Sequence, residues 1–182
     1  MLDAARQCIL ETGTLPVSMN DVAEKMGVSR SLLYFYFEGV PQMADCLFQR
    51  YAVEISGLVE QSARSEGDFG ERLRFLFRAY LAHIIEHGPL INIMLRERNM
   101  DSPLGEESRA AFRSVLRMLS QDVSQSLEVT AREAFVLLEL LSSIPEGLAR
   151  LQRAEGLPVA IAEETCDRLV LAAIDEMRVR QD

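Results

Sequence analysis

The sequence predicts an all-α protein. Apolar residues recur at the 3.6-residue spacing of helices in one segment after another. No stretch alternates apolar and polar residues between turn residues, as a half-buried strand would. The chain has 182 residues, of which 48% are hydrophobic, so it can bury a core as one large or two modest domains.

Several classes of protein are excluded by composition. The most apolar run, Phe135–Leu141, is too short to span a bilayer and contains Glu139. The chain starts with an acidic residue at Asp3 and no cationic region, so we expect no secretory signal. An odd number of widely spaced cysteines indicates reduced thiols in a cytosol rather than a disulfide framework. We therefore expect a cytoplasmic protein with no membrane segment.

The first helix is predicted over Leu2–Thr12. Its inward face carries Leu2, Ala5, Ile9 and Cys8, and Gly13 ends it. Pro16 then keeps the following connection from being helical.

Two short helices joined by a tight turn are predicted between Ser18 and Phe37. Ser18 caps the first, Asn20–Met26, and Asp21 three residues later has the spacing of a capping box. Gly27 ends that helix because a residue without Cβ adopts the left-handed backbone of a helix C-terminus.

Ser29 is an N-cap for the second short helix, and Val28 is an apolar plug in the turn before it. Leu33 and Phe37 fall on the inward face of this helix. The pattern as a whole is a helix-turn-helix.

This arrangement resembles the N-terminal DNA-binding domain of the TetR family of transcriptional regulators. The resemblance covers about the first 50 residues and rests on Gly13, the run Ser18–Phe37 and the helix that begins at Pro41. It implies that a third helix, Ser29–Phe35, lies in the major groove of a DNA operator. The residues expected to bind DNA are Ser18, Asn20, Ser29, Arg30, Ser31, Leu32, Tyr34, Phe35 and Tyr36.

The chemistry of these residues agrees with the resemblance. Arg30 can bind guanine O6 and N7 or clamp a phosphate, and Ser29 and Ser31 can donate to phosphate oxygens. Leu32 or Phe35 can pack on a thymine methyl group. The alternative for the aromatic run is that it packs the small three-helix domain, which concerns Tyr34, Phe35 and Tyr36.

Charge limits how the chain can hold DNA. The net charge of −9 excludes a diffuse nucleic-acid binder, and residues 1–50 carry four cations against six anions. The family often has a basic residue at the position of Asn20, Thr at the position of Leu32 and Lys at the position of Val40. These features motivate a second hypothesis, a dimeric helical protein whose degenerate head binds a protein partner instead of DNA.

A long helix from Pro41 to about Ala63 is predicted to link the head to the rest of the chain, and SEGDFG at Ser65–Gly70 is the expected hinge. We divide the chain into a DNA-binding domain, residues 1–50, and a larger helical domain, residues 64–182. Helices of the second domain are predicted over residues 71–87 and 91–98, from near Gly105 to about Glu128, from Ala131 to Leu151 with Thr130 as the N-cap, and over about 161–177.

The resemblance implies that the second domain binds a small molecule and forms a homodimer through the last two long helices. A physical reason supports the pairing, because the helix Ala134–Leu151 is apolar almost all round and must be covered on two sides. Pro145 inside it is expected to kink it.

An effector is expected between the helices that start near Glu71, Ile91, Gly105 and Ala131. A mostly apolar lining with few polar groups is predicted, and the alternative is that these residues are ordinary core: Tyr80, Ile84, His87, Met94, Phe112, Val115 and Glu139. Glu139 is the sharpest candidate, since a carboxylate within an apolar run needs a ligand cation, an arginine or solvent.

His83 and His87 lie four residues apart, and HIIEH matches the H-x-x-E-H pattern of one metalloprotease class. No third ligand stands out downstream, so we interpret the pair as a solvated helix edge rather than a catalytic or metal-sensing site. Arg109, Arg113 and Arg117 form a cationic stripe, interpreted as a solvated face. We predict no enzyme activity, no metal and no cofactor.

The sequence thus predicts a one-component transcriptional regulator, a repressor. It is expected to bind a palindromic double-stranded DNA operator as a homodimer and to release it when an unknown small-molecule effector binds.

Overall fold

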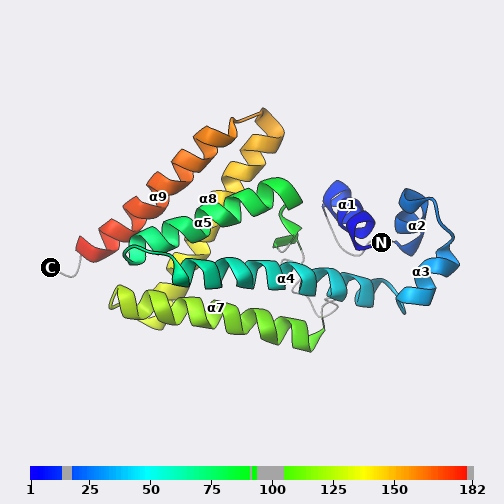
Figure 1. Ribbon diagram of the computed structural model, residues 1–182, viewed down its shortest axis with the longest axis horizontal. Helices are drawn as coiled ribbons and strands as arrows, with labels where there is room; N and C mark the ends of the chain where they lie inside the picture. The colour runs from blue at the N-terminus through cyan, green and yellow to red at the C-terminus, as the bar shows by residue number, and fades with distance from the viewer. Residues whose placement is uncertain (14–17, 91, 94–104, 180–182) are drawn as a thin grey trace. The chain divides into compact units, whose positions relative to one another are not determined.

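The computed structural model describes residues 1–13, 18–90, 92–93 and 105–179, and its secondary structure in those ranges is helical (Figure 1). The helices are α1 (Leu2–Thr12), α2 (Met19–Met26), α3 (Arg30–Tyr36), α4 (Val40–Arg64), α5 (Phe69–His87), α7 (Glu106–Ser126), α8 (Ala131–Glu155) and α9 (Val159–Val179). The predicted fold class is confirmed. Pro16, Met94 and most of the predicted helix 91–98 lie outside the described residues.

The chain forms two compact units, and each contains a discontinuous set of residues. The first comprises Met1–Glu54 and Pro89–Arg113, and the second comprises Ile55–Gly88 and Ser114–Asp182. Helices α4 and α7 each contribute residues to both units. The segment from Pro89 to Arg113, which the sequence assigns to the second domain, thus belongs to the first unit.

The first unit is built around α1, α2 and α3, with the first half of α4. Ala5, Cys8 and Ile9 of α1 are buried, as their spacing predicts. They share this core with residues from the other helices, namely Met19, Val22, Ala23, Leu33, Met43, Ala44, Leu47, Phe48 and Tyr51.

The start of α7 packs on α4 within the first unit. The Asp45 carboxylate accepts a hydrogen bond from the Gly105 backbone N–H at 2.8 Å, and Gln49 Nε2 donates to the Ser108 hydroxyl at 3.0 Å. Phe48 and Phe112 meet edge to face with ring centroids 5.7 Å apart. These contacts join residues about 60 positions apart in sequence.

The second unit is a helical layer in which α5 packs on both α8 and α9, and α8 packs on α9 (Figure 1). Its core is formed by side chains from every helix of the unit, including Val59, Leu73, Phe77, Leu81, Val123, Leu138, Leu141, Cys166, Val170 and Ile174. Burial raises the pKa of the Cys166 thiol to about 11, so this cysteine stays protonated near neutral pH.

Ionic contacts tie α5 to α9 on the surface of the second unit. Asp167 accepts from both Arg74 and Arg78 at 2.9 Å, and Arg78 also donates to Glu163 at 2.7 Å. Hydrogen bonds to carboxylates raise the pKa of both guanidinium groups, foremost the bond to Glu71 for Arg74 and the bond to Glu163 for Arg78. Because Asp167 is shared, the three helical positions are held as one network.

The helix of the second unit that contains Pro145 runs without a break from Ala131 to Glu155. Pro145 is buried there. Within the described residues, no helix is both long and apolar enough to cross a membrane.

Candidate nucleic-acid interface

The turn between α2 and α3 has the geometry that its sequence predicts. Gly27 is left-handed, with φ at 65°, and its N–H donates to the Glu24 carbonyl at 3.0 Å. The Val28 N–H donates to the Ala23 carbonyl at 3.0 Å, which completes a Schellman cap. Gly27 therefore ends α2 and redirects the chain into α3.

Both short helices are capped by serine. The Ser29 hydroxyl accepts from the Leu32 N–H at 3.3 Å, and the Ser18 hydroxyl accepts from the Asn20 N–H at 3.0 Å. The Ser18 bond is thus made to the second residue of α2, and not to the third as in a capping box. Caps at both helix starts fix where each helix begins and so which side chains of α3 point outward.

Helix α3 presents an exposed aromatic face. Leu33 is fully buried, whereas Phe35 is 81% exposed and Tyr36 is 57% exposed. Tyr34 and Leu32 are exposed as well. The alternative that these aromatic side chains pack the three-helix core is therefore wrong within the first unit, and the face is free for a partner.

Arg30 is held against this face by Tyr34. Its guanidinium Nη2 donates to the Tyr34 hydroxyl at 2.9 Å and lies over the Tyr34 ring at 5.1 Å from the centroid. The pair is four residues apart, which places both side chains on one side of α3.

Two other cations of the first unit's helices, Lys25 and Arg50, are engaged with carboxylates. Lys25 pairs with Glu11 at 2.6 Å, and this hydrogen bond raises the pKa of the lysine. Arg50 pairs with Asp3 at 3.1 Å, which raises the pKa of that arginine. Among the described residues of this unit, Arg30 makes no ion pair with an acidic side chain, so it is available to a phosphate or a guanine.

The other predicted DNA-binding residues are placed consistently with that face. Ser18, Asn20, Ser29 and Ser31 are exposed at or beside the starts of α2 and α3. Phe37, predicted as core, is half-buried at the end of α3. The DNA contacts themselves stay a prediction.

The residues predicted to line an effector site are divided between the two units. Phe112 belongs to the first unit. In the second unit Ile84 is buried, Tyr80 and Val115 pack against the core cluster, and Glu139 is exposed. Met94 lies outside the described residues. A shared lining for all seven stays a prediction.

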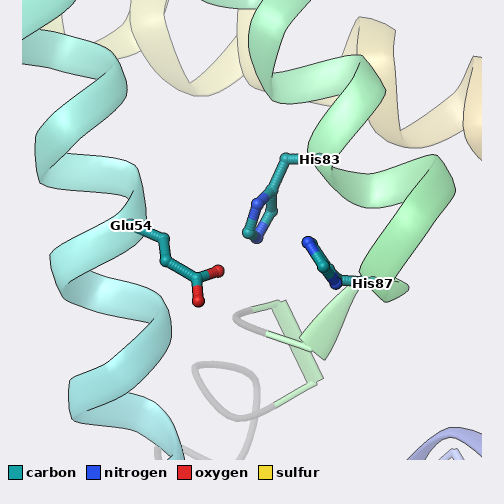
Figure 2. A group of neighbouring side chains, drawn as sticks. All are labelled: Glu54, His83 and His87. Carbon is teal, nitrogen blue, oxygen red and sulfur yellow. The ribbon is translucent and has the colours of Figure 1, made fainter.

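His83 and His87 lie on one side of α5 in the second unit, with ring centroids 4.8 Å apart. Figure 2 draws them together with Glu54 of α4. The pair by itself supplies two imidazole ligands, whereas a zinc site uses at least three protein ligands. Zinc titration by calorimetry, with His83→Ala as the control, measures whether the pair binds metal.

The last two long helices leave an apolar face uncovered in the second unit. Phe135, Val136 and Leu140 of α8 are exposed, as are Ile161 and Leu169 of α9. The opposite side of α8 is buried in the core of its own unit. Exposed apolar residues on two neighbouring helices are typical of a surface that a second copy covers.

Comparison with known proteins agrees with these features. Residues 1–39 match the family model described as bacterial regulatory proteins, tetR family. The chain is 29% identical over 87 residues to the transcriptional activator FasR of Mycolicibacterium smegmatis. That match takes in 48% of this chain and 39% of FasR, so it spans well under half of the relative.

Solved structures share the fold over nearly the whole chain. A TetR-family regulator from Streptomyces coelicolor A3 is 20% identical, with a TM-score of 0.70 over 95% of this chain and 88% of that one. A TetR-like regulator from Rhodococcus sp. RHA1 is 18% identical, with a TM-score of 0.68 over 93% and 90% of the chains. FadR from Bacillus subtilis, in complex with stearoyl-CoA, is 18% identical, with a TM-score of 0.64 over 94% and 96%.

These relatives are named as transcriptional regulators. The matched head contains the capped helix-turn-helix, and the all-helical fold is shared with TetR-like regulators. Residues 1–39 are thus similar to the tetR family of bacterial regulatory proteins, and the chain as a whole resembles solved TetR-like regulators in its fold.

Proposed function

We propose that the chain is a ligand-responsive transcriptional repressor that binds a palindromic operator as a homodimer and is released by a small-molecule effector. The observation that carries this proposal is the outward face of α3, where four large side chains are exposed beside a buried Leu33. A helix that follows a capped turn and presents such side chains fits the major groove. Arg30, which has no acidic partner among the described residues, supplies the charge.

The experiment that tests DNA reading is a footprint on operator fragments selected from the source genome. Arg30→Ala should abolish the specific footprint, because a bidentate arginine contact to guanine contributes about 1–3 kcal/mol of discrimination. The dimer should stay intact in the same variant, as measured by sedimentation. Lys25→Ala is the matched control, since Lys25 lies outside α3, in the last turn of α2, and is paired with Glu11 of α1. A footprint unchanged by Arg30→Ala would contradict the assignment.

The sign of regulation is tested separately. The relative FasR is named as an activator, whereas we propose repression for this chain. In a purified transcription assay, adding the protein to an operator-bearing promoter should lower the amount of transcript. An increase would leave DNA binding in place and make the chain an activator.

The effector is proposed to bind in the second unit. The Bacillus subtilis FadR structure contains stearoyl-CoA, so molecules with acyl chains are the first class to screen against this chain. A bound effector is proposed to tilt α4 and change the spacing of the two α3 helices away from one DNA turn, about 34–36 Å. Loss of the operator footprint on adding the effector would support this mechanism.

A second candidate function is a head that binds a protein instead of DNA. It is favoured by the net acidic charge of residues 1–50 and by the large exposed aromatic side chain of Phe35. Salt separates the two functions, because DNA affinity falls steeply as salt rises, whereas an apolar protein contact does not weaken in that way.

A further inference from the structure

The second unit contains a half-open cleft of about 380 Å³ between the end of α4, the start of α5 and the second half of α7. Its volume is within the range of small-molecule sites, about 300–1,000 Å³. None of the residues that the sequence predicts as effector-lining borders this cleft. The cleft is therefore a different site from the effector site predicted from the sequence.

The floor of the cleft is apolar. Val59 of α4 and Leu73 and Leu76 of α5 are buried there, and Leu119 of α7 is half-buried. The one buried hydroxyl of the floor, Ser62, donates its proton to the Arg72 carbonyl at 2.6 Å. A ligand that covers this floor gains by removing hydrocarbon from water rather than by hydrogen bonding.

Charge is confined to the rim. The Arg72 guanidinium lies over the Phe69 ring, 5.8 Å from its centroid, and its Nη2 atom is 3.8 Å from the Asp122 Oδ1 atom. That separation is long for an ion pair, and Asp122 is half exposed to solvent. Such surface pairs contribute only about 0–1 kcal/mol, so Asp122 is a weak competitor for the guanidinium.

The carboxylate of a ligand can bind the Arg72 guanidinium more strongly than Asp122 does. It can take two parallel N–H bonds from the guanidinium fork, which is the strong geometry for this pair of groups. The guanidinium already packs over the Phe69 ring, which restricts its motion, so less side-chain entropy is lost when the carboxylate binds.

We propose that this cleft binds a small amphipathic carboxylate, with its hydrocarbon on the Val59–Leu73–Leu76–Leu119 floor and its carboxylate on Arg72 in place of Asp122. Binding of this ligand can be tested without an operator. The inference rests on the proposed function only where it treats the ligand as the effector. Val59 and Ser62 lie on α4, so the ligand would touch the helix proposed to transmit the signal.

The test measures binding of sodium decanoate to the purified full chain without DNA, by calorimetry below the micelle concentration. Decanoate should bind at one site. Its affinity should fall at least tenfold, by about 1.4 kcal/mol or more, in Arg72→Gln, because a charge-assisted hydrogen bond is lost. In Asp122→Asn it should rise about two- to fivefold, because the competitor for Arg72 is neutralised.

Matched controls distinguish recognition of the carboxylate charge from non-specific hydrophobic binding. Arg168→Gln removes an equally charged, exposed arginine of the same unit and should leave the affinity unchanged. Decanol and decyltrimethylammonium carry the same chain with a neutral and a cationic head, and both should bind at least tenfold more weakly than decanoate. Labelled Met118, half exposed at the cleft, should report the site through a shift of its methyl resonance.

Opposite results overturn the proposal. Tighter binding of the cationic probe, with loss in Asp122→Asn, would make the cleft a cation site. Equal binding of the three probes would show that Arg72 plays no part in recognition. If decanoate binds as expected but leaves the operator footprint unchanged, the cleft is a carboxylate-binding site, and the proposal that its ligand releases the operator is wrong.

Discussion

Single backbone positions with positive φ follow the ends of helices in this chain, and two of them differ in whether the residue suits that conformation. Gly27 ends α2 in the left-handed region, where glycine has no steric cost. Glu128 stands in the same region after α7, with φ at 50°, although it carries a side chain. The Ser124 hydroxyl donates to the Val129 carbonyl at 2.6 Å and helps to hold that turn.

Gly27→Ala should lower the free energy of unfolding by about 1 kcal/mol, because Cβ clashes with the following carbonyl at positive φ. Gly57→Ala is the control. It lies inside α4 with open space around its Cβ position, so the same change should stabilise by about 0.5–1 kcal/mol. Urea unfolding of the three proteins measures both values. A Gly27→Ala variant as stable as wild type would contradict the left-handed cap.

Glu128→Gly should have the opposite effect to Gly27→Ala. Relief of the strained backbone outweighs the added entropy of the unfolded chain, and we expect a gain of about 0.5 kcal/mol in the free energy of unfolding. Glu128→Ala keeps the strain and should give no such gain. Thermal melting of both variants distinguishes a backbone effect from loss of the carboxylate.

At the scale of one element, the N-terminus of α8 is held by hydrogen bonds between Thr130 and Glu133. The Thr130 hydroxyl accepts from the Glu133 N–H at 3.2 Å, and the Glu133 carboxylate accepts from the Thr130 N–H at 2.9 Å. This is a complete capping box, and Thr130 was predicted as the cap. The hydrogen bonds from Thr130 lower the pKa of Glu133 below its ordinary value of 4.5.

The capping box should make α8 sensitive to acid. A carboxyl group whose pKa is lower in the folded state stabilises the fold above its unfolded pKa, near 4.5, and loses that contribution as pH falls through the folded pKa. Glu133→Gln should therefore melt below wild type at pH 7, and the gap should narrow as pH falls below 4.5. An equal gap at both pH values would show that the carboxylate charge is not involved.

At the scale of the whole molecule, the uncovered face of α8 and α9 bears on assembly. Leu140 is 64% exposed in the single chain, among other exposed apolar residues of the two helices. Monomeric proteins seldom leave such neighbours open to water without a partner. We infer that a second copy covers them.

Leu140→Glu should weaken the dimer about a hundredfold, since burying an unpaired charge in an interface costs about 2–5 kcal/mol. Val53→Glu, at another exposed apolar residue on α4, is the control and should leave the dimer intact. Sedimentation equilibrium measures both. If Leu140→Glu also dimerises like wild type, the pairing surface lies elsewhere.

Local features of this protein were predictable from sequence, because their causes are local. Gly27, Ser29 and Thr130 act within one helical turn, so their roles as caps could be predicted from neighbouring residues alone. The inward positions of α1 and α3 followed from helical periodicity. These confirmed predictions include the all-α fold class and the head, whose residues 1–39 match the tetR family model.

The tertiary structure decided what depends on distant segments meeting. The aromatic run of α3 has a helical pattern that suits a core or a surface equally, and only packing of the head showed it to be exposed. Glu139 lies in an apolar run, yet its side of α8 is exposed. The cleft at Arg72 joins three helices separated in sequence, and periodicity describes one helix at a time. Sequence by itself determined which capping residues begin and end several of the helices, whereas the tertiary structure decided which helix faces are open, because burial depends on contacts between residues far apart in the chain.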